Sequence, residues 1–346
     1  MKHSIFIMIT GLILLSACSK VKVSRQLPAV ANVNITQLSA SQIAWVNQIA
    51  KVKQDSINKV DSLQKATGVV DPNSLFNKQN MLVGLVNVND HYFPNINCFV
   101  DQNGKPVFDL TVAFSANINM DPATQKPYVQ FNPEWQALLQ NGTVKEVQRV
   151  GMPIAIGLLG NHDAAGWSNF PNLAACTAFA QIVAFQVRRY GFQAVFADDE
   201  YSNSPSEPAA SNSYVMAMSE IKRLLPDIYL IYYSIGGGSG SYNGKQMGDI
   251  ADADFPPFYP EAPLFGELNF PNNKLFTAFQ EGAGYDTTTM RGYLKQGTRG
   301  IYVYNVGGGD PGFYGPYVQL LKGKGTTLSV PAMCLNPNVT DFINGQ

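Results

Sequence analysis

Residues 192–201 read FQAVFADDEY, an apolar run that ends in three consecutive carboxylates. The run has the length and the aromatic and β-branched content of a buried strand. Charged residues make up only 14% of the 346-residue chain, so a cluster of acids at a strand end stands out. This unit, a buried strand followed by polar residues, is repeated along the chain and decides the predicted fold.

Similar apolar runs alternate with amphipathic helical stretches from residue 80 onward. The predicted strands are 81–88, 108–116, 152–160, 192–198, 228–235, 251–258, 274–279 and 300–306. The predicted helices include 134–150, 174–190, 212–225 and 287–296. Eight strands with intervening helices over about 250 residues are what a (β/α)8 TIM barrel of the α/β class requires. A doubly wound open sheet is disfavoured, because no glycine-rich phosphate loop follows the first strand.

The barrel is expected to occupy residues 80–335, followed by a tail at 336–346. Before it, residues 19–79 are expected to form a tether and a short helical segment, because apolar residues recur there at helical spacing. The segment is predicted to be one long surface helix or a helical hairpin. Ser39 or Ser41 is expected to cap its start, and Gly68 to end it. Its function stays open, and a spacer on the barrel surface is the simplest interpretation.

Residues 1–18 have the pattern of a secretory signal, with a basic start, an apolar stretch and small residues before Cys18. The end of this segment, LSAC at 15–18, resembles a bacterial lipobox, which predicts a lipid on Cys18. A lipid-anchored lipoprotein of the bacterial cell envelope, on the periplasmic face or the cell surface, is therefore expected. An ordinary secretory signal with a chance cysteine is the alternative.

Three further cysteines, Cys98, Cys176 and Cys334, are odd in number and lack CxxC spacing. This pattern predicts buried thiols rather than a disulfide framework or a zinc site. The net charge of −1 gives no electrostatic footprint for nucleic acid. We expect a monomer that contacts the membrane only through its lipid anchor.

The loops at the predicted carboxyl ends of the strands are rich in amides and aromatic rings and poor in basic groups. TIM barrels carry their active sites at this end. Such loops suit a neutral polyhydroxylated ligand, whose hydroxyls bond amides and acids and whose apolar faces stack on rings. Alternatively, Asn, Asp and Gly only form turns there. The residues predicted to line a ligand site are Asn161, His162 and Trp167 after the third strand and Tyr304, Asn305 and Asp310 after the eighth.

The acids of the opening stretch divide between two faces. Side chains alternate along a strand, so Phe196, Asp198 and Glu200 share one face, and Asp199 points the other way. If the first three face the barrel axis, Asp198 and Glu200 project into its mouth about 6–7 Å apart by Cα. Carboxyls this close couple their titrations, so one of them can stay protonated near neutral pH. A protonated Glu beside an ionised Asp is suited to glycosidic cleavage. An exposed acidic strand end is the alternative.

Four segments in order resemble glycoside hydrolase family 18, and within it the endo-β-N-acetylglucosaminidases of the endoglycosidase H and F type. They are VAFSANINMD (112–121), GLLGNHDAAGWSNF (157–170), YGFQAVFADDEY (190–201) and IYVYNVGGGD (301–310). The resemblance covers about residues 82–330. It implies cleavage of the GlcNAc–GlcNAc core of N-linked glycans, on a free glycan or a glycoprotein, without metal or cofactor.

The resemblance also implies roles for single residues. The substrate's own 2-acetamido oxygen is the nucleophile in this family, which yields an oxazolinium intermediate and retained configuration. The family motif DxxDxDxE ends in the general acid and base, which corresponds to Glu200, and its last Asp, which orients the acetamide, corresponds to Asp198. The tyrosine that bonds the acetamide after the sixth strand corresponds to Tyr259.

The chain departs from this motif at its first two aspartates. Gln193 stands at the first, and Phe196 stands at the second, directly below Asp198 on the same face. A phenyl ring cannot share a proton with Asp198, and it excludes water, so Asp198 should be harder to ionise. An endo-β-N-acetylglucosaminidase is expected, and a catalytically impaired glycan-binding lipoprotein is the alternative. A chitinase is disfavoured, because no inserted domain fits between the last two strands.

Overall fold

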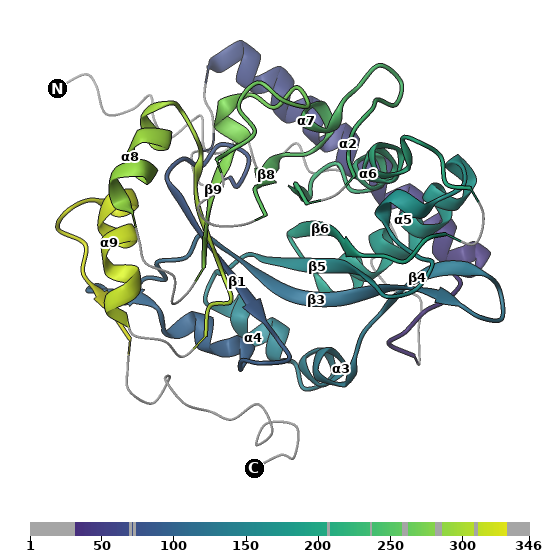
Figure 1. Ribbon diagram of the computed structural model, residues 1–346, viewed down its shortest axis with the longest axis horizontal. Coiled ribbons are helices and arrows are strands. Elements are labelled where there is room, and N and C mark those ends of the chain that lie inside the picture. The colour runs from purple at the N-terminus through teal and green to yellow at the C-terminus, as the bar shows by residue number, and fades with distance from the viewer. Residues whose placement is uncertain are drawn as a thin grey trace, which may run out of the picture.

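The computed structural model describes residues 32–68, 71, 74–205, 208–235, 237–257, 262–280, 286–307 and 311–330. Its centre is a ring of parallel strands surrounded by helices (Figure 1). The ring consists of β1 (Met81–Asn87), β3 (Leu110–Asp121), β5 (Ile154–Asn161), β6 (Ala194–Tyr201), β7 (Tyr229–Tyr233), β8 (Ala253–Phe255), β9 (Phe276–Gln280) and β10 (Gly300–Tyr304). The strands pair in the order β8-β7-β6-β5-β3-β1-β10-β9, and a parallel bridge from Asp254 to Leu275 joins the two ends. The predicted TIM barrel is confirmed, and each predicted strand overlaps an observed one.

Both faces of the barrel strands are buried, which explains why they are continuous apolar runs in the sequence. In β1, Met81, Val83 and Leu85 belong to the inner core, and Leu82 and Val86 face the outer layer of helices. The inner core also contains large rings from several strands, among them Phe114, Phe196, Tyr229, Tyr233, Phe255, Phe276 and Tyr302. The barrel is therefore filled by side chains up to its carboxyl rim.

The outer layer contains α3 (Pro133–Gln140), α4 (Thr143–Arg149), α5 (Leu173–Tyr190), α6 (Ser213–Leu224), α7 (Met247–Ile250), α8 (Thr287–Lys295) and α9 (Pro311–Lys322). Short 3-10 helices η1 (Phe93–Cys98), η2 (Trp167–Asn169) and η3 (Asn272–Lys274) complete the connections. The single helix predicted at 134–150 is two helices. The break falls at Gly142, whose φ of 76° lies in the left-handed region that glycine adopts readily.

Strand β3 is longer than the sequence suggested. The predicted strand ends at residue 116, but β3 continues to Asp121 and turns back as β4 (Lys126–Gln130), which pairs with it antiparallel. The Asp121 carboxylate accepts hydrogen bonds from Ala123 N and Thr124 Oγ1 at 2.9 Å and so holds the turn. A second small sheet pairs β2 (Val100–Asp101) with β11 (Leu328–Ser329).

The helix before the barrel is a single element, α2 (Ala40–Thr67). Ser39 caps its start in a capping box with Gln42, and Gly68 ends it at a φ of 68°. Its first half packs on α5 and α6, where Val46 is buried, whereas Val60 and Leu63 in its second half are about half exposed. Figure 1 shows the helix running along the outside of the barrel beside α6.

The cysteine prediction is wrong in one respect. Cys98, at the end of η1, is disulfide-bonded, so it is not an unpaired thiol as expected from the odd number of cysteines. Cys176 is a buried free thiol, and its burial raises its pKa to about 12. Cys18 and Cys334 lie outside the described residues. In the part of the chain that the structure describes, no helix is long and apolar enough to cross a membrane.

Candidate active site

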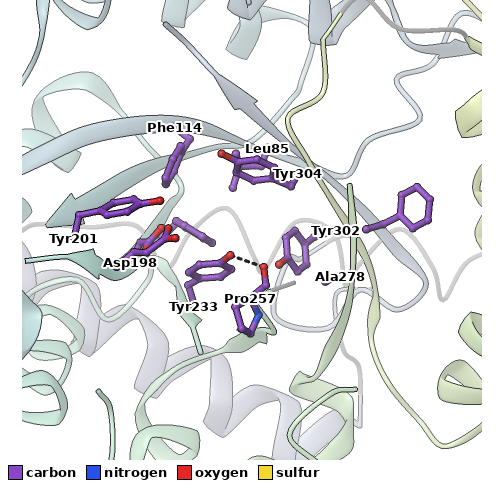
Figure 2. A pocket seen from close by; sticks show the side chains of 12 residues that line it. Leu85, Phe114, Asp198, Tyr201, Tyr233, Pro257, Ala278, Tyr302 and Tyr304 are labelled. Atoms are coloured by element: carbon purple, nitrogen blue, oxygen red, sulfur yellow. Dashed lines mark hydrogen bonds between the residues drawn. The ribbon is translucent and has the colours of Figure 1, made fainter. Parts of the chain in front are cut away.

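A cavity of about 180 Å³ opens at the carboxyl ends of the barrel strands (Figure 2). Its lining is Leu85, Phe114, Phe196, Asp198, Glu200, Tyr201, Tyr233, Pro257, Ala278, Phe279, Tyr302 and Tyr304. These residues come from β1, β3, β6, β7, β9 and β10 and from the segment after β8. The two acids predicted for the rim thus lie together in one cavity that is otherwise lined by aromatic and apolar side chains.

The predicted division of the acids between two faces of β6 is confirmed. Asp198 and Glu200 line the cavity, with Phe196 below them. Asp199 points outward, and its carboxylate accepts hydrogen bonds from the backbone amides of Trp167 and Ser168, both at 3.0 Å. Asp199 therefore holds η2 against the strand, and the other two acids remain available in the cavity.

Asp198 is almost completely buried, with 1% of its surface exposed. Its Oδ1 has no hydrogen-bond partner within the described part of the chain. Burial, followed by the negative charges of Glu200 and Asp199, raises the pKa of Asp198 well above its ordinary value, and a bond from the Glu200 amide offsets this only in part. Because a buried charge without a partner is costly, burial favours the neutral form of Asp198.

Phe196 fills the position directly below Asp198. It is 1% exposed. Its ring packs against Tyr233, Phe114 and Phe255 with ring centroids 5.4, 6.0 and 6.0 Å away. The space that holds a carboxylate in the family motif is therefore a packed aromatic layer.

Gln193, at the first motif position, has a structural role. Its Oε1 accepts a hydrogen bond from Ile154 N at 2.9 Å, at the start of the neighbouring strand β5. Asp109 and Asp252 accept in the same way from Leu82 N at 2.7 Å and Leu230 N at 2.8 Å. In each case a polar side chain just before one strand accepts a hydrogen bond from a backbone amide near the start of the adjacent strand. An amide oxygen serves here as well as a carboxylate does.

Tyrosine hydroxyls surround the carboxyl pair. Figure 2 shows Asp198 and Tyr201 on one side of the cavity and Tyr302 and Tyr304 on the other, with Tyr233 between them. The Tyr233 hydroxyl donates to the carbonyl of Pro257 at 2.5 Å. Burial and the nearby acids raise the pKa of Tyr233 and Tyr304. Both hydroxyls therefore stay protonated. The Tyr233 proton is engaged by Pro257, and the Tyr304 hydroxyl can donate a hydrogen bond to a ligand.

Tyr201 contacts both Glu200 in the cavity and His162 on the rim. A hydrogen bond to the Glu200 side chain, more than burial, raises the pKa of Tyr201 to about 12. Its ring lies 5.1 Å from the ring of His162, which is exposed and has a φ of 55°. His162 N also donates to the Tyr201 carbonyl at 2.9 Å. His162 and the half-buried Asn161 therefore lie beside the acidic end of β6.

Trp167 does not line the cavity, and its predicted ligand contact is wrong. The indole is fully buried, donates from Nε1 to the Leu158 carbonyl at 3.1 Å and stacks on Tyr214 at 5.4 Å. The loop after β5 folds back here, because Asp199 binds the Trp167 amide and draws the ring under α5 and α6. The side chain belongs to the outer core and supports the loop that carries His162.

The other predicted rim residues divide into three groups. Tyr304 lines the cavity. Asn305 is half-buried just after β10 and does not line it. Tyr259 and Asp310 lie outside the described residues. The loops after β5 and β10 follow parallel strands of one barrel, so they lie at the same end, as predicted.

Several lining residues were not predicted, namely Phe114, Tyr201, Tyr233 and Tyr302. Their strands were recognised, but the alternation of side chains identifies the inner face only once one inward residue is known. The position of Tyr201, next to Glu200, was the one available signal. Groups of three or more His, Cys, Asp or Glu side chains that could hold a metal ion are not found within the described ranges.

No family model matches this chain. It is 31% identical over 185 residues to an endo-β-N-acetylglucosaminidase of Flavobacterium sp. (strain SK1022), which covers 51% of this chain and 58% of that protein. It is 35% identical over 161 residues to endo-β-N-acetylglucosaminidase F1 of Elizabethkingia meningoseptica, which covers 44% of this chain and 47% of that protein. The chain thus spans about half the length of the curated relatives it matches.

Two solved structures share the fold. Both are of EndoBT-3987 from Bacteroides thetaiotaomicron. The complex with a Man5GlcNAc product has a TM-score of 0.63 at 24% identity and covers 73% of this chain and 62% of that chain. The complex with a Man9GlcNAc2Asn substrate has a TM-score of 0.63 at 23% identity and covers 75% of this chain and 69% of that chain. This likeness supports the barrel assignment.

Proposed function

We propose that this protein is an endo-β-N-acetylglucosaminidase that hydrolyses the GlcNAc-β1,4-GlcNAc core of N-linked glycans. The observation that carries the proposal is the pair Asp198 and Glu200 on one face of β6, in a tyrosine-lined cavity at the carboxyl rim of the barrel. The names of the curated relatives support the reaction, and the glycan complexes of EndoBT-3987 support the substrate class.

In the proposed reaction Glu200 protonates the glycosidic oxygen between the two sugars. The 2-acetamido oxygen of the substrate attacks C1 from the other face and forms an oxazolinium ion, which Asp198 orients through the acetamide N–H. Glu200 then removes a proton from water as it attacks C1, so the configuration at C1 is retained. Glu200 accordingly acts first as the acid and then as the base.

The cavity suits such a substrate. The carboxyl pair is surrounded by the rings of Phe114, Tyr201, Tyr233 and Tyr304, which offer apolar faces to a sugar, and the neutral Tyr304 hydroxyl offers a hydrogen-bond donor. His162, exposed beside Tyr201, is proposed to contact the glycan outside the cavity.

One observation favours a second function, a glycan-binding protein without turnover. Phe196 replaces the carboxylate that supports the last Asp of the family motif, and it leaves Asp198 in an apolar setting. A binding protein would use the same cavity and the same rings. Turnover therefore separates the two functions, and binding does not.

We further propose that Cys18 carries a lipid and that the protein is anchored as a monomer in the bacterial cell envelope. The support is the LSAC sequence at 15–18 after an apolar stretch. The glycan or glycoprotein substrate would then be met at the envelope. The partition of Cys18→Ala into the soluble fraction, with the wild type in the membrane fraction, is the expected result.

Incubation with a glycoprotein that carries one defined N-glycan tests the proposed reaction. Cleavage leaves a single GlcNAc on the asparagine, which mass spectrometry detects, and Glu200→Gln provides the background in the same assay. Retention of the full glycan by every substrate, together with saturable binding of the released glycan, would establish the binding protein instead.

A further inference from the structure

Acidic side chains gather at the carboxyl end of the barrel. The connections that follow seven of its strands contain nine acids but no lysine and no arginine. These connections are residues 88–92, 122–125, 162–166, 202–212, 256–271, 281–286 and 305–310. The connection after β7 is the exception, because it contains Lys245. The carboxyl end therefore has an excess of negative charge, to which the acids at the end of β6 add.

Basic side chains gather at the amino end. The helices α4, α5, α6 and α8 lead from the rim back to the next strand, so their last turns lie at the amino end of the barrel. Each of these last turns, and that of α9, contains a lysine or an arginine. Contacts fix the place directly, because Lys322 at the end of α9 pairs with Asp109, just before β3.

The helix dipole explains only part of this division. It favours a cation in each last turn, but the effect falls off within one turn. It therefore does not account for whole connections without lysine or arginine, such as 202–212 and 256–271. The net charge of −1, from which membrane contact through a lipid alone was predicted, hides this separation of charge.

The two ends can act separately on a partner. The 18-residue helix α5 spans the barrel from rim to base and is about 27 Å long. Interactions between exposed charges are largely screened beyond about 8–10 Å at moderate ionic strength. The acids of the rim therefore do not cancel the attraction of an anionic surface to the amino end.

Three cations at the amino end are free to meet such a surface. Arg149 ends α4, Lys295 ends α8, and Lys324 follows α9. All three are exposed, and none forms an ion pair with another residue that the structure describes. Figure 1 shows α8 and α9 side by side, with α4 further round the barrel. The apolar side chain of Val150, next to Arg149, is also exposed. We call Arg149, Lys295 and Lys324 the basal patch.

The chain also enters the described fold at this end. The carbonyl of Asn32 accepts a hydrogen bond from Arg189 Nη1 at 3.0 Å, and that of Val33 accepts one from Gln186 Nε2 at 2.9 Å. Both donors lie in the last part of α5, close to the start of β6. A lipid on Cys18 would thus be attached through residues 19–31 to the end of the barrel that carries the basal patch.

We propose that the basal patch binds the headgroups of anionic phospholipids, so that the amino end of the barrel faces the membrane. Anionic lipids attract a lysine or arginine close to the membrane surface, and they repel the acidic rim. The cavity with Asp198 and Glu200 then opens away from the bilayer, where a large glycoprotein can reach it. The inference goes beyond the proposed reaction, and it agrees with the lipid proposed on Cys18 without depending on it.

Vesicle sedimentation of the chain that starts at residue 19, and so carries no lipid, tests the inference. The vesicles consist of phosphatidylcholine with about one quarter phosphatidylglycerol, or of phosphatidylcholine alone. We expect the protein to partition into the first and not into the second, and the partition to weaken as salt is added, because salt screens the attraction. Equal partition into both, or into neither, overturns the inference.

Charge variants locate the surface that binds. Lys324→Gln and Lys126→Gln each remove one exposed cation, the first from the basal patch and the second from the β3–β4 hairpin at the rim. We expect Lys324→Gln to lower the partition coefficient by up to about fivefold, and Lys126→Gln to leave it unchanged. Combining Arg149→Gln, Lys295→Gln and Lys324→Gln should lower it by at least about tenfold. An equal loss in the two single variants would mean that net charge controls binding, and the inference would be wrong.

These measurements need neither turnover nor lipidation, so they are separate from the proposed function. If Cys18 carries no lipid, the proposed anchor fails and the vesicle results still decide the inference. Heparin, a soluble polyanion, provides a second comparison. Binding of heparin without binding of phosphatidylglycerol vesicles would show that the basal patch does not recognise a lipid surface.

Discussion

The acids at the amino end of the barrel have lysine partners, whereas Asp198 at the carboxyl end lies beside other acids. At the amino end, Asp109 accepts from Leu82 N and forms ion pairs with Lys78 at 2.7 Å and with Lys322. Asp252 likewise accepts from Leu230 N and pairs with Lys222 at 2.6 Å. At the carboxyl end, Asp198 has acids and phenols as neighbours and an oxygen without a partner in the described residues.

The difference shows what each end does. The acids at the amino end satisfy backbone amides and have lysines that balance their charge, so ionisation there is compatible with a stable fold. At the carboxyl end, burial disfavours the charged form of Asp198 and raises its pKa. Such raised pKa values are common at sites that bind ligands or transfer protons. The same residue type thus contributes to stability at one end and to the proposed chemistry at the other.

The largest expected effect lies at the carboxyl end. Glu200→Gln keeps the shape of the side chain but removes its proton, so cleavage should fall by about 10²–10⁴-fold, the contribution of a positioned general acid. Glycan affinity and thermal stability should stay close to wild type, because the amide still fits the cavity. Rates on a defined N-glycan, with calorimetric binding as the control, measure both. An unchanged rate would remove Glu200 from the mechanism.

The next effect lies at the amino end. Asp109→Asn keeps one acceptor for Leu82 N but leaves Lys78 and Lys322 without their buried anion. We expect the free energy of unfolding to fall by about 1.5–3 kcal/mol. The rate per folded molecule should not change. Denaturant unfolding measures the first quantity and the glycan assay the second; a loss of rate without a loss of stability would contradict the comparison.

Much of this contrast was predictable from the sequence. The buried runs gave the strands, and the period of two placed Asp198 and Glu200 together and Asp199 apart. The polar residues just before strands, such as Asp109 and Gln193, carry a signal as well, because a free amide on the next strand needs an acceptor. These features follow from local rules of strand geometry.

The rest depends on contacts between distant segments. Trp167 lies inside the outer core because Asp199, 32 residues away, binds its amide. The end of β3, beyond the predicted strand, is held by Asp163, whose carboxylate accepts hydrogen bonds from Asn119 Nδ2 and Met120 N at 2.8 and 2.7 Å. No local pattern reports such pairings. The disulfide of Cys98 was missed for the same reason.

A third prediction concerns the stability of the carboxyl end. The raised pKa of Asp198 means that ionisation favours the unfolded chain, so the folded state is penalised above the unfolded pKa of about 3.9. Asp198→Asn should remove this penalty. At neutral pH we expect Tm to rise by about 2–4 °C, the shift that about 1 kcal/mol gives a domain of this size.

The gain from Asp198→Asn should shrink as the pH falls toward 4 and the unfolded aspartate also becomes protonated. Cleavage should be strongly reduced at the same time, because a neutral amide cannot balance the charge of the oxazolinium ion. A variant that loses stability at neutral pH would show that Asp198 is held by favourable contacts, and the contrast between the two ends would fail. Scanning calorimetry at several pH values gives the answer.

The smallest expected effect is at the junction of α2 with the barrel. Lys53 of α2 pairs with Asp227 at 2.9 Å, and Arg188 of α5 pairs with the same carboxylate. Burial raises the pKa of Asp227, but Arg188 and then Lys53 lower it overall.

Because the Lys53 side chain is 45% exposed, Lys53→Met should lower the free energy of unfolding by only about 0.2–1 kcal/mol. For an acid with a depressed folded pKa, this stability is present above the unfolded pKa of about 3.9 and is lost as the pH falls through the folded value. Wild type and Lys53→Met should therefore differ in urea unfolding at neutral pH and converge in acid. Lys51→Met, on an exposed position of the same helix, is the matched control. An equal difference at both pH values would mean that α2 is held by its apolar contacts around Val46 and that Asp227 adds nothing to them.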